Sequence, residues 1–143
     1  MLINFSSNNI ESQRNINNVL GPSFTLIERF KMLGVNSPKM KIIKASVNIN
    51  NFLIIDQNIN ICDIQLRPKG ILITFQKRLD IYALAIPYYK LSIYKGDLNA
   101  YTFFKDQYFI KILATDRDKK IHSFISKILS EKEKNRPTQL EDL

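Results

Sequence analysis

The stretch that decides the fold runs from Ile64 to Leu129 and reads IQLRPKGILITFQKRLDIYALAIPYYKLSIYKGDLNAYTFFKDQYFIKILATDRDKKIHSFISKIL. It consists of short apolar segments typical of β-strands, with a turn about every ten residues. It closes on one amphipathic helix, after which the chain is polar. This order predicts a small sheet or barrel plugged by a C-terminal helix, an architecture that usually binds something and rarely catalyses a reaction.

Length and composition indicate one globular domain. The chain has 143 residues, of which 45% are hydrophobic and 24% are charged. Apolar runs such as 71–75 are far too short to span a bilayer, and the N-terminus lacks the pattern of a secretory signal. The single cysteine, Cys62, excludes an internal disulfide, and its apolar neighbours indicate a buried side chain. We therefore expect a cytoplasmic protein.

The net charge of +8 allows two interpretations. A basic protein can bind nucleic acid or an anionic membrane surface. However, the chain is rich in Ile, Asn and Lys together, as expected for an AT-rich bacterial genome. Compositional drift and selection for a polyanion both remain open.

The N-terminal part divides into two segments. Residues 1–21 are rich in Asn and Ser and predict a flexible arm, or a weak helix that needs a docking surface. Residues 22–38 predict a helix and linker, capped by Ser23 and ended by Gly34. The residues expected on one apolar face of this helix are Leu26, Ile27, Phe30 and Leu33. This face would pack on the protein's own sheet or mediate self-association.

Residues 39–130 predict the β domain. The expected strands are 42–49, 52–56, 59–66, 71–76, 80–86, 90–94, 101–104 and 107–114. Asn50-Asn51 and Lys105-Asp106 favour tight hairpins, and Gly70 supplies the permissive dihedral of the Arg67–Gly70 turn. Segment 71–76 is apolar on both faces and should lie centrally.

The C-terminal helix has the clearest pattern. Thr115 can cap it, and Asp116 and Asp118 suit its first turn. The apolar stripe comprises Ile121, Phe124, Ile125, Ile128 and Leu129. Full burial of each large side chain contributes roughly 1.5–3 kcal/mol, so the stripe should close the core. Residues 131–143 are polar, contain Pro137 and predict a disordered tail.

The order of a sheet followed by a helix resembles the pleckstrin-homology (PH)-like superfold, specifically its bacterial branch. The residues that carry the resemblance are 70–73, 85–91 and the final strand and helix, 108–129. The resemblance implies a mainly β (α+β) fold: a partly open barrel of about seven antiparallel strands with its C-terminal helix plugging one end. It also implies binding, since members bind phospholipid headgroups, peptides or other proteins. Phosphoinositide-binding members carry basic residues on the first two strands and their loop, whereas 56–60 contains no Lys or Arg.

No residue pattern predicts catalysis, a metal or a cofactor. His122, the only histidine, falls outside the apolar stripe and is expected on the surface in solvent. One histidine and one cysteine cannot form a zinc site of the usual spacing, and the four glycines are isolated. The sequence therefore favours a protein that is not an enzyme.

Basic residues gather at one end of the sheet if consecutive strands alternate in direction. The candidate ligand- or partner-binding residues at this end are Arg67, Lys69, Lys90 and Lys105. The alternative is that they are solvated turn residues. All six tyrosines lie between Tyr82 and Tyr108, which is typical of strand packing and also of nucleic-acid stacking surfaces.

Together these patterns predict a non-enzymatic binding or adaptor module. We expect a protein partner at an exposed strand edge or in a groove beside the helix. One alternative is peripheral association with anionic lipids at the inner face of the membrane, through the basic end. Another is nucleic-acid binding by the sheet face, and homo-oligomerisation through residues 26–30 also stays open.

Overall fold

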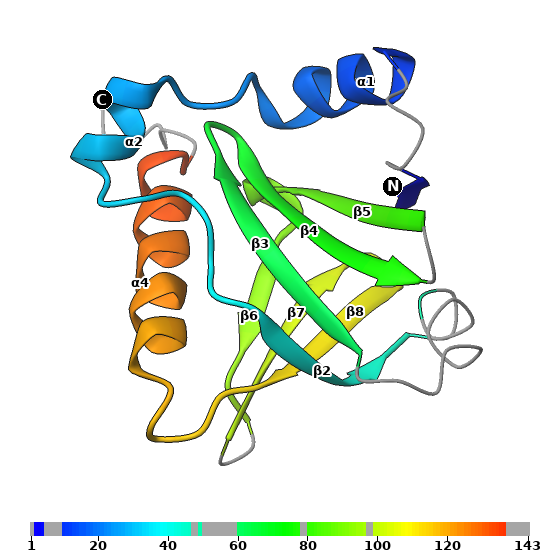
Figure 1. Cartoon of the computed structure of the whole chain (residues 1–143), viewed down its shortest axis with the longest axis vertical. Helices are drawn as coiled ribbons and strands as arrows, with labels where there is room; N and C mark the ends of the chain where they lie inside the picture. The colour runs from blue at the N-terminus through cyan, green and yellow to red at the C-terminus, as the bar shows by residue number, and fades with distance from the viewer. Residues whose placement is uncertain are drawn as a thin grey trace, which may run out of the picture.

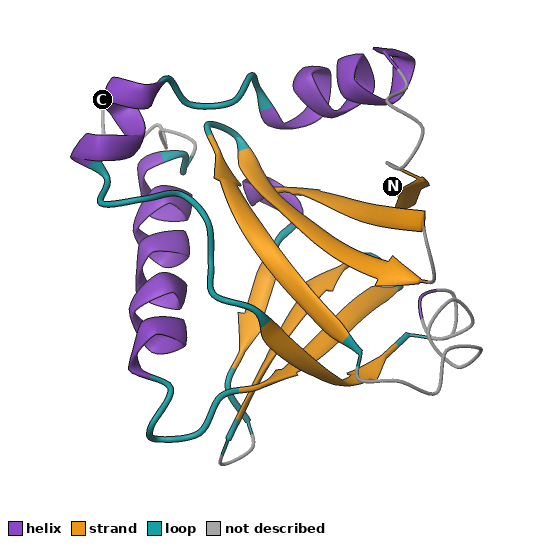
Figure 2. Cartoon of the chain, viewed as in Figure 1, coloured by secondary structure: helices purple, strands orange, loops and turns teal. Residues whose placement is uncertain are grey.

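The computed structural model describes residues 2–4, 10–46, 49, 60–77, 80–96 and 99–136. The described chain is mainly β, with helices at both ends (Figures 1 and 2). Its elements in chain order are β1 (Leu2–Asn4), α1 (Ile10–Leu20), α2 (Leu26–Lys31), β2 (Met40–Ala45), β3 (Ile61–Arg67), β4 (Gly70–Lys77), β5 (Asp80–Pro87), the 3-10 helix η1 (Tyr88–Lys90), β6 (Ser92–Tyr94), β7 (Ala100–Lys105), β8 (Tyr108–Leu113) and α4 (Lys119–Lys134).

The strands form one antiparallel sheet that folds over on itself. Among the described residues it has eight strands in the order β1-β5-β4-β3-β2-β8-β7-β6. Strand β2 joins the two halves: Met40 and Lys41 pair with β3, whereas the part from Ile42 to Ala45 pairs with β8 across an irregularity. The β3–β5 half therefore crosses the β6–β8 half (Figure 1). A mainly β fold that ends in a helix is confirmed.

The core lies between the two halves and is closed by α4. Inward side chains of the strands, such as Ile73 and Phe103, share one cluster with four residues of the predicted helical stripe. Those four are Ile121, Phe124, Ile125 and Ile128, all no more than 6% exposed. Leu129 is 49% exposed, so its predicted burial is wrong. Cys62 is buried as predicted.

Helix α4 begins and ends later than the sequence suggested. The backbone N–H and the hydroxyl of Thr115 both donate to Asp118 Oδ2, at 2.7 and 3.0 Å. Thr115 is thus fixed in the turn before the helix and does not cap it. At the other end the helix continues to Lys134, whose Nζ lies 3.1 Å from Glu131 Oε1. The prediction of a disordered tail is therefore wrong for 131–134.

The segment predicted as a flexible arm or weak helix contains β1 and α1. Ile16 and Leu20 of α1 are buried on the outer face of the sheet, where they form a second apolar cluster with Leu72, Ala83 and Ala85. Of the two predicted alternatives, the docked helix is the one observed for residues 10–20. Because β4 is covered on both faces, its expected central position is confirmed.

Gly70 has a different role from the one predicted. Its φ is not positive, so it does not supply an unusual turn dihedral. A Cβ at this position would instead lie 2.3 Å from the Ile86 carbonyl oxygen and 2.6 Å from Leu20 Cδ2. The glycine is needed because α1 and β5 approach the β3–β4 turn so closely.

Helix α2 is shorter than expected and presents its apolar face to solvent. Thr25, not Ser23, caps it: Glu28 N–H donates to Thr25 Oγ1 at 3.2 Å, and the Glu28 carboxylate accepts from Thr25 N–H at 3.0 Å. Gly34 follows the helix at a positive φ of 98°. The exposed side chains are Leu26, Ile27, Phe30 and Leu33, at 69% to 84%. The prediction that this face packs on the protein's own sheet is therefore wrong, because Phe24 and Met32 contact the core in its place. Self-association stays a prediction.

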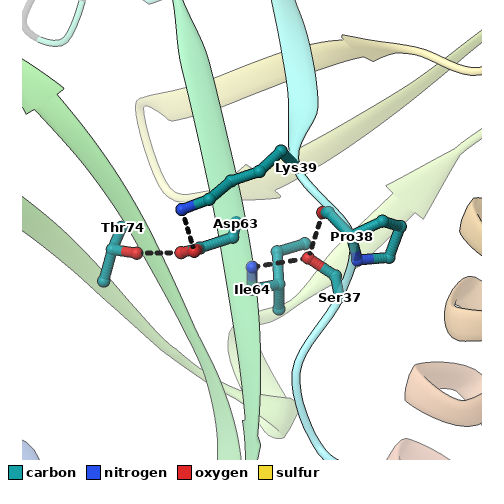
Figure 3. Close-up of polar contacts among 6 residues, drawn as sticks. All are labelled: Ser37, Pro38, Lys39, Asp63, Ile64 and Thr74. Carbon is teal, nitrogen blue, oxygen red and sulfur yellow. Dashed lines mark hydrogen bonds and ion pairs between the residues drawn. The ribbon is translucent and has the colours of Figure 1, made fainter.

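The linker between α2 and β2 is fixed along β3. Ser37 Oγ accepts from Ile64 N–H at 2.8 Å, and Ser37 N–H donates to Ile64 carbonyl at 2.8 Å. Lys39 Nζ lies 2.8 Å from Asp63 Oδ2, and Thr74 Oγ1 donates to Asp63 Oδ1 (Figure 3). These contacts hold the linker as one wall beside α4.

The hairpins are confirmed only in part. The β7–β8 hairpin turns at Asp106-Gln107, one residue later than predicted, with Asp106 at a φ of 52°. The predicted partner strand 52–56 lies outside the described residues. Residues 88–90, part of which was predicted as strand, form η1, and β6 begins at Ser92.

Candidate functional site: a groove beside α4

A pocket of about 490 Å³ lies between η1 and the C-terminal half of α4. It is lined by Tyr88, Tyr89, Leu129, Lys132, Glu133, Asn135 and Arg136. Tyr88 is buried, and its hydroxyl donates to the Arg67 carbonyl at 3.1 Å. Tyr89 is 78% exposed. The pocket therefore combines a fixed tyrosine with two accessible apolar side chains, those of Tyr89 and Leu129.

The groove carries a modest positive charge. Arg136 Nη1 lies 3.4 Å from Glu133 Oε1, so these two charges offset one another. Lys132 makes no ion pair with any described residue. Burial raises the pKa of Tyr88 still further above neutral, so this hydroxyl lines the pocket as a neutral hydrogen-bonding group. The groove can thus hold an apolar group with an acidic group nearby.

Strand β6 follows one wall of this groove closely in the chain and offers an edge that is unpaired among the described residues. It follows η1 after one residue, Leu91. Ser92, Ile93 and Tyr94 pair with β7, and no other described strand pairs with them. Tyr94 is 63% exposed. An unpaired edge presents backbone N–H and C=O groups to which another strand can bind.

A second groove, of about 530 Å³, follows the N-terminal half of α4. Its walls are the fixed linker and the helix, and it is lined by Leu33, Asn36, Ser37, Pro38, Lys119, Lys120, Ser123, Phe124 and Lys127. Lys127 Nζ donates to the carbonyls of Leu33 and Gly34, at 3.0 and 3.3 Å. This contact ties α4 to the end of α2.

The predicted basic residues do lie at one end of the sheet, but most are engaged within the protein. Arg67 and Lys105 are buried, at 6% and 8% exposure, and Lys105 Nζ donates to the Ala85 carbonyl at 3.0 Å. Lys90 Nζ lies 3.4 Å from Asp106 Oδ2. Lys69 is exposed and makes no ion pair with a described residue. The predicted cluster therefore retains one unpaired surface cation.

His122 is a structural residue and not a solvated one. It is half-buried, with Tyr101 Oη 2.7 Å from Nδ1 and the Thr115 carbonyl 2.8 Å from Nε2. The histidine thus joins α4 to β7 and to the turn before the helix. Its surface location was predicted from the helical stripe, which cannot reveal a polar partner on another strand.

The tyrosines do not form a common stacking surface. Tyr88 and Tyr101 are buried, whereas Tyr89 and Tyr94 are exposed. Packing therefore explains only part of their clustering in sequence. Tyr89 and Leu129 were not predicted as site residues. The available signal was the position of Leu129 at the edge of the helical stripe, where a side chain is least covered.

Other kinds of site find little support in the described part of the chain. No group of three or more His, Cys, Asp or Glu side chains lies close enough together there to hold a metal ion. None of its helices has the length and apolar character needed to cross a membrane. Comparison with protein-family models found no matching family, and comparisons with curated proteins and with solved structures found no matching relative.

Proposed function

We propose that the chain is a PH-like domain that acts as a non-enzymatic protein-binding module. Its ligand is an extended peptide segment of a partner protein, bound along β6 and in the groove between η1 and α4. The observation that carries this proposal is the placement of exposed Tyr89 and Leu129 in one pocket, whose wall η1 leads after one residue into β6, a strand with an unpaired edge among the described residues.

The PH-like assignment rests on the order of elements. Among the described residues, seven antiparallel strands, β2 to β8, precede a helix that closes their core. This matches the number of strands and the final helix that the sequence resemblance implies. The elements β1, α1 and α2 are then N-terminal additions. The 56–60 loop contains no Lys or Arg, which argued against inositol phosphate binding. This loop lies outside the described residues except for Asn60.

The proposed binding mode divides affinity from specificity. Backbone groups of 92–94 pair with the peptide main chain. This pairing supplies affinity that does not depend on the peptide sequence. Because β6 has only three residues, this pairing is short, and the groove must supply the remaining affinity. Its volume of about 490 Å³ suits one or two large side chains. Lys132 favours a peptide with an acidic residue next to an apolar or aromatic one.

A protein partner is better supported than a polyanion. Anionic lipids and nucleic acids require several accessible cations on one surface. At the predicted basic end, Lys105 donates to the Ala85 carbonyl, Lys90 pairs with Asp106, and Arg67 is only 6% exposed, so this surface lacks several accessible cations. The groove beside α4, in contrast, exposes apolar side chains in a concave setting, as peptide sites do.

Selection from a library of displayed linear peptides tests the proposal. Enriched peptides should bind the full chain, and Leu129→Asp should weaken their binding at least ~10-fold, since a charge would replace an apolar contact in the groove. Leu26→Asp is the matched control, because it introduces the same charge on an exposed helical leucine that does not line this groove. Equal loss in both variants, or binders insensitive to both, would show that the groove is not the site.

A further inference from the structure

Arg67 is buried and has no carboxylate partner among the residues that the structure describes. It is 6% exposed, yet within the described part of the chain its guanidinium donates hydrogen bonds only to neutral groups. Nε donates to Gln65 Oε1 at 2.7 Å, and Nη1 donates to Asn17 Oδ1 and to the Gly21 carbonyl, both at 3.0 Å. Among the described residues, Nη2 has no hydrogen-bond acceptor. A buried charge is normally paired, so this cation lacks the anion that its burial calls for.

A second arginine increases the excess of positive charge. Arg29, from α2, is half-buried, and its Nε donates to the Phe24 carbonyl at 3.0 Å. The pKa of Arg67 is lowered, first by burial and then by repulsion from the positive charge of Arg29. Among the described residues neither arginine has an ion-pair partner, so neither positive charge is offset there.

A pocket of about 290 Å³ adjoins Arg67. The described residues that line it are Gln13, Ile16, Asn17, Ser23 and Arg67, most of which are polar and none of which is acidic. Its volume corresponds to about ten water molecules, which is enough for an oxyanion with a small organic group attached. The pocket is separate from the groove beside α4, since the two share no lining residue.

From this arrangement we propose a binding site for a phosphate group in this pocket, between α1, the loop before α2 and β3, with Arg67 as the cation at its wall and Arg29 as the second positive charge. A phosphate monoester carries close to two negative charges at neutral pH, which matches two guanidinium groups, and its oxygens suit the planar arginine fork. Ser23 places a hydroxyl at the wall of the same pocket. This site depends on α1 and α2, the additions to the proposed PH-like core, and it is independent of the peptide groove.

Inorganic phosphate is the first probe. In a two-dimensional NMR titration of the full chain at constant ionic strength, we expect saturable shifts of the amides of Asn17, Gly21 and Arg67. Arg29→Gln should weaken phosphate binding at least ~10-fold, as expected when one charge-assisted contact is lost. Lys69→Gln is the control, because it removes the same charge from an exposed residue near Arg67 and should change the affinity less than about two-fold.

Arg67→Gln provides the stronger test if the variant folds, and Arg29→Gln suffices if it does not.

Glycerol 3-phosphate and vesicles containing phosphatidic acid then distinguish the two sources of a phosphate group. Binding of the soluble ester supports a small phosphorylated ligand, whereas binding to the vesicles alone, abolished by Arg29→Gln, supports a lipid headgroup. The proposal is overturned if sodium chloride reproduces the shifts, if neither phosphate source binds, or if Arg29→Gln binds as tightly as the unchanged protein.

Discussion

Replacement of Phe124 by alanine tests how α4 closes the core. Phe124 is 4% exposed and belongs to the main apolar cluster, so truncation removes most of a buried aromatic ring. Phe→Ala substitutions in cores cost about 3–5 kcal/mol. One side of this ring borders the second groove, so water can enter the vacated space. We therefore expect a loss of about 3 kcal/mol, at the lower end of that range.

Urea denaturation followed by circular dichroism measures this loss as a change in the free energy of unfolding. Leu129→Ala on the same helix is the control: with Leu129 49% exposed, we expect a loss of about 1 kcal/mol or less. A loss below 1 kcal/mol for Phe124→Ala, or equal losses for both variants, would refute the packing of α4 against the sheet.

Three further predictions concern single side chains. Gly70→Ala should lower the free energy of unfolding by about 2 kcal/mol in urea denaturation, because its Cβ would lie 2.3 Å from the Ile86 carbonyl oxygen; an unchanged midpoint would contradict the close approach. His122→Phe should cost about 1–2 kcal/mol in the same assay, since it removes the contacts with Tyr101 and Thr115, and a neutral effect would place the histidine in solvent. Burial raises the pKa of Cys62 from 9.0 to about 12, so the thiol stays protonated in the folded protein and ionises earlier in the unfolded one. Its contribution to stability should therefore be intact below pH 9 and decline towards pH 12, and a thiol reagent at pH 8 should react with Cys62 only in denaturant; rapid reaction of the native protein would contradict its burial.

The sequence predicted those features that depend on periodicity. Alternating apolar residues predicted the strands of the β domain. The helical stripe predicted the packed face of α4, which comprises Ile121, Phe124, Ile125 and Ile128. In both, many apolar side chains must be buried together, so few arrangements satisfy the pattern. Buried Cys62 followed from its neighbours by the same reasoning.

The sequence was misleading where a short segment depends on distant contacts. Helix α2 has six residues, and its face is set by Phe24 and Met32 rather than by the apolar residues within it. Arg67 was assigned to a basic surface, because nothing local shows that Asn17 of α1 and Gly21 after this helix cover it. The peptide groove likewise joins η1 to α4, elements separated by three strands in the chain.

Hydrogen exchange at β6 tests the proposed function most directly. The amides of 92–94 should become protected when a selected peptide binds the full chain, because the peptide would cover this edge and add main-chain hydrogen bonds to it. Leu129→Asp should remove the protection at the same peptide concentration, and Leu26→Asp should retain it. Unchanged exchange in β6, with protection confined to another part of the sheet, would contradict the binding mode that we propose.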